Sequence, residues 1–107
     1  MPLLRRRFAD LVVRQLDLYE SENRPRLEGL ASDLAAHRAG DDEDHLETYG
    51  DYQDGVDVAA SELMSIRNTY ARSLDPDTVP GYEKAFLRAV RRRFPALATA
   101  IETEDVG

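Results

Sequence analysis

The apolar residues of this sequence recur at steps of three and four, the periodicity of helices that bury one face. The most regular run lies between residues 49 and 74. Its apolar seam consists of Tyr49, Tyr52, Val56, Ala59, Leu63, Ile66 and Tyr70. No stretch alternates as a β-strand does, and no repeat of solenoid length occurs. The pattern predicts an all-α protein organised around this central helix.

Four other segments also have helical periodicity. They are residues 2–20, 24–38, 80–94 and a short stretch after Pro95. In the first, Val13 alone is displaced from the apolar arc. Asn23 is the expected N-cap of the second helix, and Gly40 is placed to end it. Pro95 is expected either to kink the helix before it or to begin a short fifth helix.

The central helix is predicted to begin near Asp42, because negative charge is favourable in a first turn. Gly50 and Gly55 each cost about 1 kcal/mol inside a helix, so a break near Gly50 is left open. The helix should end before Asp75-Pro76-Asp77, since the residue before a proline is driven out of the α region.

Short connections between these helices predict that consecutive helices are antiparallel. The expected architecture is an up-down-up-down four-helix bundle with a short C-terminal tail helix, in a single domain over residues 1–107. Residues 102–107 are expected to fray. The residues expected to be buried together are Leu11, Leu30, Leu34, Val56, Leu63, Ile66, Phe86 and Val90.

Composition narrows the class of protein. The chain has 107 residues, a formal net charge of -7 and no cysteine, which removes disulfides, thiolate metal sites and cysteine nucleophiles. The opening residues 1–7 are too charged for a signal peptide, and no run is apolar enough to cross a membrane. A cytoplasmic protein without membrane attachment is therefore expected.

Motifs for catalysis, metals and cofactors are weak. Two acid–histidine pairs have helical metal-ligand spacing, Asp33 with His37 and Asp42 with His45, but two ligands do not make a site. There is no glycine-rich phosphate loop and no nucleophile elbow. The sequence thus predicts neither an enzyme nor a bound cofactor.

Seven arginines form the most distinctive charged feature. They are Arg5, Arg6, Arg7, Arg88, Arg91, Arg92 and Arg93. In an up-down-up-down bundle the start of the first helix and the end of the fourth share one end, so these arginines should cluster as a possible anion-binding or partner-binding site. The same topology would bring the acidic residues 41–47 beside them, and neutralisation by those acids is the simpler expectation.

The function predicted from these patterns is a non-catalytic protein–protein interaction or self-association module. A homodimer is expected because the central helix outruns the second helix, which leaves part of its seam for another surface to cover. The tail helix around Leu97 and Ile101 is the alternative cover, within one chain. The alternative is a nucleic-acid-associated or anion-binding regulator that uses the arginine cluster, although the acidic net charge makes nucleic-acid binding unfavourable.

Overall fold

The described part of the chain consists of five helices and their connections. The structure, a computed structural model, describes the backbone of residues 2–39 and 45–106 and the side chains of residues 8–39 and 49–105. The helices are α1 (Pro2–Glu22), α2 (Arg24–Arg38), α3 (His45–Ala71), α4 (Val79–Arg93) and α5 (Pro95–Val106). No strand occurs within these ranges, which confirms the all-α prediction.

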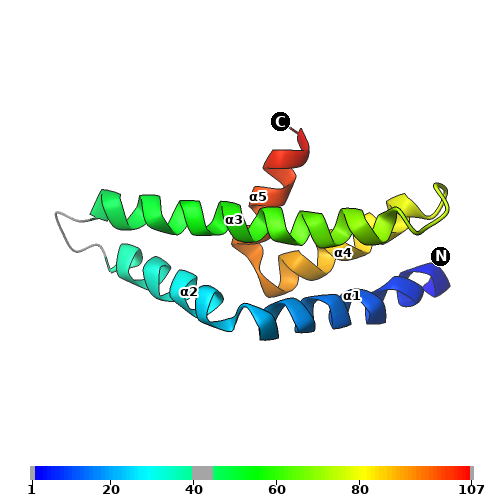
Figure 1. Cartoon of the computed structure of the whole chain (residues 1–107), viewed down its shortest axis with the longest axis horizontal. Coiled ribbons are helices and arrows are strands. Elements are labelled where there is room, and N and C mark those ends of the chain that lie inside the picture. The colour runs from blue at the N-terminus through cyan, green and yellow to red at the C-terminus, as the bar shows by residue number, and fades with distance from the viewer. Residues whose placement is uncertain (1, 40–44, 107) are drawn as a thin grey trace.

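The first two helices follow one another along the long axis of the molecule, and α3 runs back in the opposite direction (Figure 1), packed against α2, α4 and α5. Only Asn23 separates α1 from α2. Its amide Nδ2 donates to the carbonyl of Tyr19, 2.9 Å away, so it closes the end of α1, and it makes no side-chain cap on α2. Connections that reverse a helix pair need at least about two residues. A one-residue break therefore bends the chain instead of reversing it.

The expected antiparallel pairing of the first two helices is accordingly not confirmed. The up-down-up-down bundle also predicts that α4 is antiparallel to α1, and the structure differs on this point too. The rings of Phe8 and Tyr82, near the starts of α1 and α4, are 5.6 Å apart. Arg93, at the end of α4, lies beside Asp17, in the second half of α1. The two helices are therefore parallel.

The central helix is continuous. Its described part begins at His45 and ends at Ala71, with Gly50 and Gly55 inside it, so it is not broken near Gly50. The predicted start near Asp42 lies outside the described residues. The chain then turns through residues 72–78, where the Thr78 hydroxyl donates to the carbonyl of Asp75 over 2.8 Å. The predicted stop at Asp75-Pro76-Asp77 is confirmed.

The last two helices meet at a sharp bend. Phe94 leaves the helical conformation, with φ of -136° and ψ of 74°, and Pro95 begins α5. A following proline disfavours the α region, and Phe94 lies outside it. Figure 1 shows α5 turned away from the long axis, and the stretch expected to fray is helical as far as Val106.

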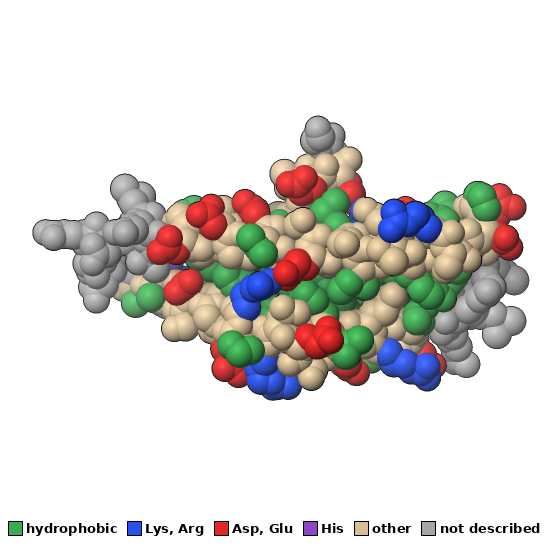
Figure 2. All heavy atoms as spheres, viewed as in Figure 1, with side chains coloured by type: hydrophobic (Ala, Val, Ile, Leu, Met, Phe, Trp, Pro, Cys, Tyr) green, Lys and Arg blue, Asp and Glu red, His purple; other side chains and the backbone are tan. Residues whose placement is uncertain are grey.

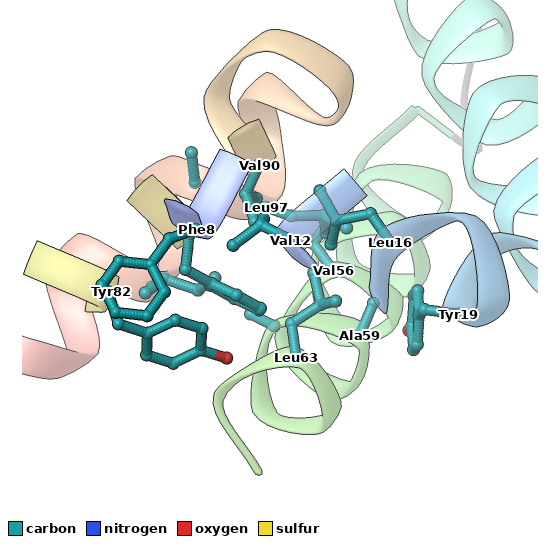
Figure 3. Packing of buried hydrophobic residues seen from close by; sticks show 14 of the residues in the cluster. Phe8, Val12, Leu16, Tyr19, Val56, Ala59, Leu63, Tyr82, Val90 and Leu97 are labelled. Atoms are coloured by element: carbon teal, nitrogen blue, oxygen red, sulfur yellow. The ribbon is translucent and has the colours of Figure 1, made fainter. Parts of the chain in front are cut away.

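Side chains from α1, α3, α4 and α5 meet in one core (Figure 3). Its buried hydrophobic members are Phe8, Val12, Leu16, Tyr19, Tyr52, Val56, Ala59, Ala60, Leu63, Tyr82, Phe86, Val90, Leu97, Ala98 and Ile101. Of the residues predicted to be buried, Val56, Leu63, Phe86 and Val90 are confirmed. The remaining four, Leu11, Leu30, Leu34 and Ile66, are only partly buried against this core.

Tyr82 lies at the centre of the aromatic part of the core. Its ring centroid is 5.0 Å from that of Tyr70 and 6.0 Å from that of Phe86. Its hydroxyl donates to Gln15 Oε1 over 3.0 Å, as a buried tyrosine hydroxyl requires a partner. Burial raises the pKa of Tyr82. The bond to Gln15 thus ties α4 to α1 from inside the core.

The molecule is elongated because one part of it is only two helices thick. The radius of gyration is 15.5 Å, against about 13 Å for a compact chain of this length. We call α2 and residues 45–56 of α3 the arm. No residue of α2 is buried. Within the described ranges, no helix combines the length and apolar character needed to cross a bilayer.

Candidate functional site

The arginines at the end of α4 separate into two kinds. The Nη1 atom of Arg93 is 2.8 Å from Asp17 Oδ1 and 3.5 Å from Glu20 Oε1, an ion-pair geometry rather than aligned hydrogen bonds. Arg91 pairs with Glu102 of α5. By contrast, Arg88 and Arg92 are exposed and form no ion pair with another described residue. Among the described side chains, acids of α1 and α5 therefore neutralise two of these four arginines.

This packing does not bring the two arginine runs together as predicted. Because α1 and α4 are parallel, the backbone of residues 5–7 lies towards the start of α4, and Arg91–Arg93 are at its other end. A helix of 15 residues is about 22 Å long, which separates the two runs. The side chains of Arg5, Arg6 and Arg7, and the acidic residues 41–47 expected beside them, lie outside the described side chains.

Arg88 and Arg92, together with the paired Arg93, line a groove between α1 and α4, which we call the basic groove. Its volume is about 780 Å³. The lining residues are Ala9, Val13, Leu16, Gly81, Lys84, Ala85, Arg88, Ala89, Arg92 and Arg93. Four of them are cationic and none is acidic, in a chain whose net charge is -7. Arg93 is paired with Asp17 and Glu20, so Lys84, Arg88 and Arg92 supply the positive charge of the groove.

Helical spacing explains how α4 builds this groove. Lys84, Arg88 and Arg92 stand four residues apart and therefore follow one another along a single face. Gly81, Ala85 and Ala89 repeat with the same spacing and form a low floor beside that row. On the α1 side, Val13 is 43% exposed and supplies apolar surface. Its displacement from the apolar arc of residues 2–20 thus marks a groove wall.

A second groove lies along the arm, and we call it the arm groove. Its volume is about 640 Å³. The apolar lining residues are Leu27, Leu30, Ala31 and Leu34 of α2, Tyr52 and Val56 of α3, and Phe94, Pro95, Ala96 and Leu97 around the α4–α5 bend. The charged lining residues are Glu20, Arg24, Glu28 and Arg38, two of each sign. Figure 2 shows hydrophobic side chains along the seam between the α1–α2 layer and α3.

The bend between α1 and α2 is fastened to α3 by a polar network. Tyr19 donates its hydroxyl to Glu62 Oε1 over 2.8 Å, and Arg26 pairs with the same carboxylate. The hydrogen bond from Arg26, with help from Tyr19, lowers the pKa of Glu62 against the opposing effect of partial burial. Burial and the bond to Glu62 raise the pKa of Tyr19. All three groups are engaged with one another, which suits a structural role.

No metal centre is visible in the part of the chain that the structure describes. Within that part, no three histidine, cysteine, aspartate or glutamate side chains gather closely enough to hold an ion. The His37 ring packs against Tyr49, with 4.7 Å between the ring centroids. The other acid–histidine pair, Asp42 with His45, lies outside the described side chains.

No protein-family model matches the sequence, and comparisons with curated proteins and with solved structures give no significant match. The function is therefore inferred from the chain's own surfaces.

Sequence reasoning named Arg88, Arg91, Arg92 and Arg93 but missed Lys84, which shares the row of Arg88 and Arg92. It also missed Arg67, a buried arginine whose Nη1 and Nη2 atoms donate to Asp105 over 2.9 and 3.3 Å. Arg67 stands four residues after Leu63 and thus on the buried face of α3. That spacing was the available signal for an arginine that joins α3 to α5.

Proposed function

We propose that the chain is a non-catalytic, cytoplasmic self-association module in which the arm of one copy packs against the arm of a second copy. The observation that carries the proposal is the state of α2: it presents Leu27, Leu30 and Leu34 towards the arm groove, yet buries no residue. Isolated helices of about 15 residues are marginal in water, and most helical stability comes from packing an apolar face. A second surface over the groove would supply that packing.

The charges around the arm groove favour a second copy as the occupant. A two-fold interface brings the same patch of both subunits together, so each sign of charge needs its opposite within that patch. The lining holds two acids and two bases. Two chains that each carry a net charge of -7 repel one another over most surfaces, and a balanced patch avoids that repulsion.

The architecture changes the reason for expecting a dimer. The sequence suggested that the central helix outran the second helix, and in the structure α3 has 27 residues against 15 in α2. In the structure α2 continues where α1 ends, and α3 packs against α2, α4 and α5 (Figure 1). The surface that would be shared between copies is the groove beside α2.

The proposed assembly is testable by substituting Ala31, an exposed residue that lines the arm groove. Ala31→Glu places a charge in the groove without removing a buried side chain. Ala36→Glu makes the same change on the same helix, at an exposed position outside the groove. Light scattering coupled to gel filtration should give twice the chain mass of 12.1 kDa for the wild type and for Ala36→Glu, and a mass near 12.1 kDa for Ala31→Glu.

Three results would contradict the proposal. The first is a wild-type mass of 12.1 kDa at every concentration measured. The second is a dimer that Ala31→Glu leaves intact. The third is equal disruption by both substitutions, which would indicate that charge on α2 acts through helix stability instead of through the arm groove. Circular dichroism of each variant separates loss of association from loss of folding.

A further inference from the structure

The basic groove is a second candidate surface. It lies between α1 and α4, whereas the arm groove is lined mainly by α2, α3 and the α4–α5 bend. It combines a row of cations, an apolar wall at Val13 and a floor of small residues. We propose that this groove binds an acidic amphipathic helix of a partner protein. Carboxylates of that helix would face Lys84, Arg88 and Arg92, and its apolar stripe would lie over Val13 and the alanines of α4.

Charge complementarity is the first argument. None of Lys84, Arg88 and Arg92 forms an ion pair with a residue in the described ranges, whereas the neighbouring Arg91 and Arg93 are both paired. The cations of the row are separated by about 6 Å along the helix axis, which is four residues of helix. Acidic residues at every fourth position of another helix have the same separation. A straight helix can therefore match the whole row.

The shape of the floor supports a helix as the occupant. Helices pack with their axes about 8 to 10 Å apart, and small side chains at the contact allow the closer distances. Gly81, Ala85 and Ala89 keep the floor low along two turns of α4. At Gly81 a Cβ atom would lie 3.8 Å from Phe8 Cε2, an ordinary van der Waals distance to α1.

The lining disfavours nucleic acid. Proteins that hold single strands stack the bases on aromatic side chains, and the lining residues of this groove include no aromatic residue. A duplex would meet a narrow strip of cations on a chain whose net charge is -7, and phosphate binding needs broad positive surface. An acidic helix needs only the strip. This inference does not depend on dimerisation, because it uses α1 and α4 and leaves the arm free.

A direct test uses a fluorescent synthetic peptide that is helical, with glutamate at every fourth position beside a stripe of alanine and leucine. The reference peptide has glutamine in place of each glutamate. Binding is followed by fluorescence anisotropy with wild type, Arg88→Gln, the double variant Arg88→Gln/Arg92→Gln, and Arg14→Gln. Arg14 is an exposed arginine of α1 outside the groove. Arg14→Gln therefore changes the net charge by the same amount as Arg88→Gln and leaves the groove lining intact.

We expect the acidic peptide to bind wild type and Arg14→Gln alike, and to bind more tightly than the glutamine peptide. Each charge removed from the row should weaken binding by up to about fivefold, the upper end for one exposed ion pair. Val13→Asp, which places a negative charge on the apolar wall, should weaken binding further. Binding should survive in Ala31→Glu, whatever its oligomeric state.

The inference is wrong if the acidic and glutamine peptides bind equally, or if Arg14→Gln weakens binding as much as Arg88→Gln. It is also wrong if the acidic peptide does not bind. Titrations with labelled single-stranded and duplex DNA at physiological salt complete the test. Tighter binding of either DNA than of the acidic peptide would assign the groove to nucleic acid instead.

Discussion

Leu30 of α2 occupies the space that a side chain at Gly55 of α3 would need. Its Cδ2 atom is 2.5 Å from the point where a Cβ atom at position 55 would lie. A glycine inside a helix costs about 1 kcal/mol relative to alanine. At position 55 this cost allows Leu30 to lie directly against the backbone of α3 and so brings the two helices of the arm together.

The first prediction concerns this contact and compares two glycines of the same helix. Gly50→Ala should stabilise the protein by up to about 1 kcal/mol, because nothing lies within 4 Å of a Cβ there. Gly55→Ala should gain less or destabilise, since Leu30 must move. In a Leu30→Ala background, Gly55→Ala should recover the gain seen at Gly50. Denaturant unfolding of the double-mutant cycle measures this coupling, and additive effects would show that Leu30 is not constrained by Gly55.

The second prediction is a pH dependence that originates at Glu62. Its pKa is lower in the folded protein than in the unfolded chain, so the ionised carboxylate stabilises the fold above the unfolded value of about 4.3. That contribution is lost as the pH falls through the folded pKa. Glu62→Gln should therefore cost about 1 kcal/mol or less at pH 7, with the difference from wild type shrinking below about pH 4.

Unfolding measured across this pH range checks the assignment. Glu22→Gln serves as the control, because Glu22 is exposed and forms no ion pair with a described residue. It should follow the wild-type profile. A cost of Glu62→Gln that stays constant down to pH 3 would show that the carboxylate charge is not what Arg26 and Tyr19 recognise.

The third prediction concerns the attachment of α5. Arg67 is 8% exposed, and its guanidinium has Asp105 as its charged partner among the described residues. Asp105→Ala leaves that buried charge with fewer hydrogen bonds and should cost about 1 to 2 kcal/mol. Hydrogen exchange of the α5 amides should accelerate in this variant. Glu104→Ala, at the exposed neighbouring position, should leave exchange in α5 unchanged, and equal effects of both changes would contradict the role of the Arg67 pair.

The fourth prediction tests the core through two positions of α3. Leu63 is fully buried, and Leu63→Ala should lower the free energy of unfolding by about 2 to 5 kcal/mol, the range for a core leucine. Val58 is 49% exposed, and Val58→Ala should change stability by no more than about 0.5 kcal/mol. A loss below about 1 kcal/mol at Leu63 would show that this seam is not the centre of the core.

The sequence by itself determined the helices and the buried face of the longest one. Periodicity located the seam from Tyr52 to Leu63, and proline chemistry located the ends at residues 75–77 and at Pro95, because both signals depend on neighbours only a few residues away. The same local signals predicted two members of the cation row of α4, Arg88 and Arg92, because residues four apart on a helix share a face whatever the surroundings.

Only the tertiary structure decided how the helices run relative to one another. The local sequence around Asn23 indicates only that one helix ends and another begins. The direction of α2 depends on its packing against α3. Parallel α1 and α4 separated arginine runs that an up-down bundle would have joined, and packing against α5 buried Arg67 beside Asp105. Such pairings join residues far apart in the chain, so no local periodicity encodes them.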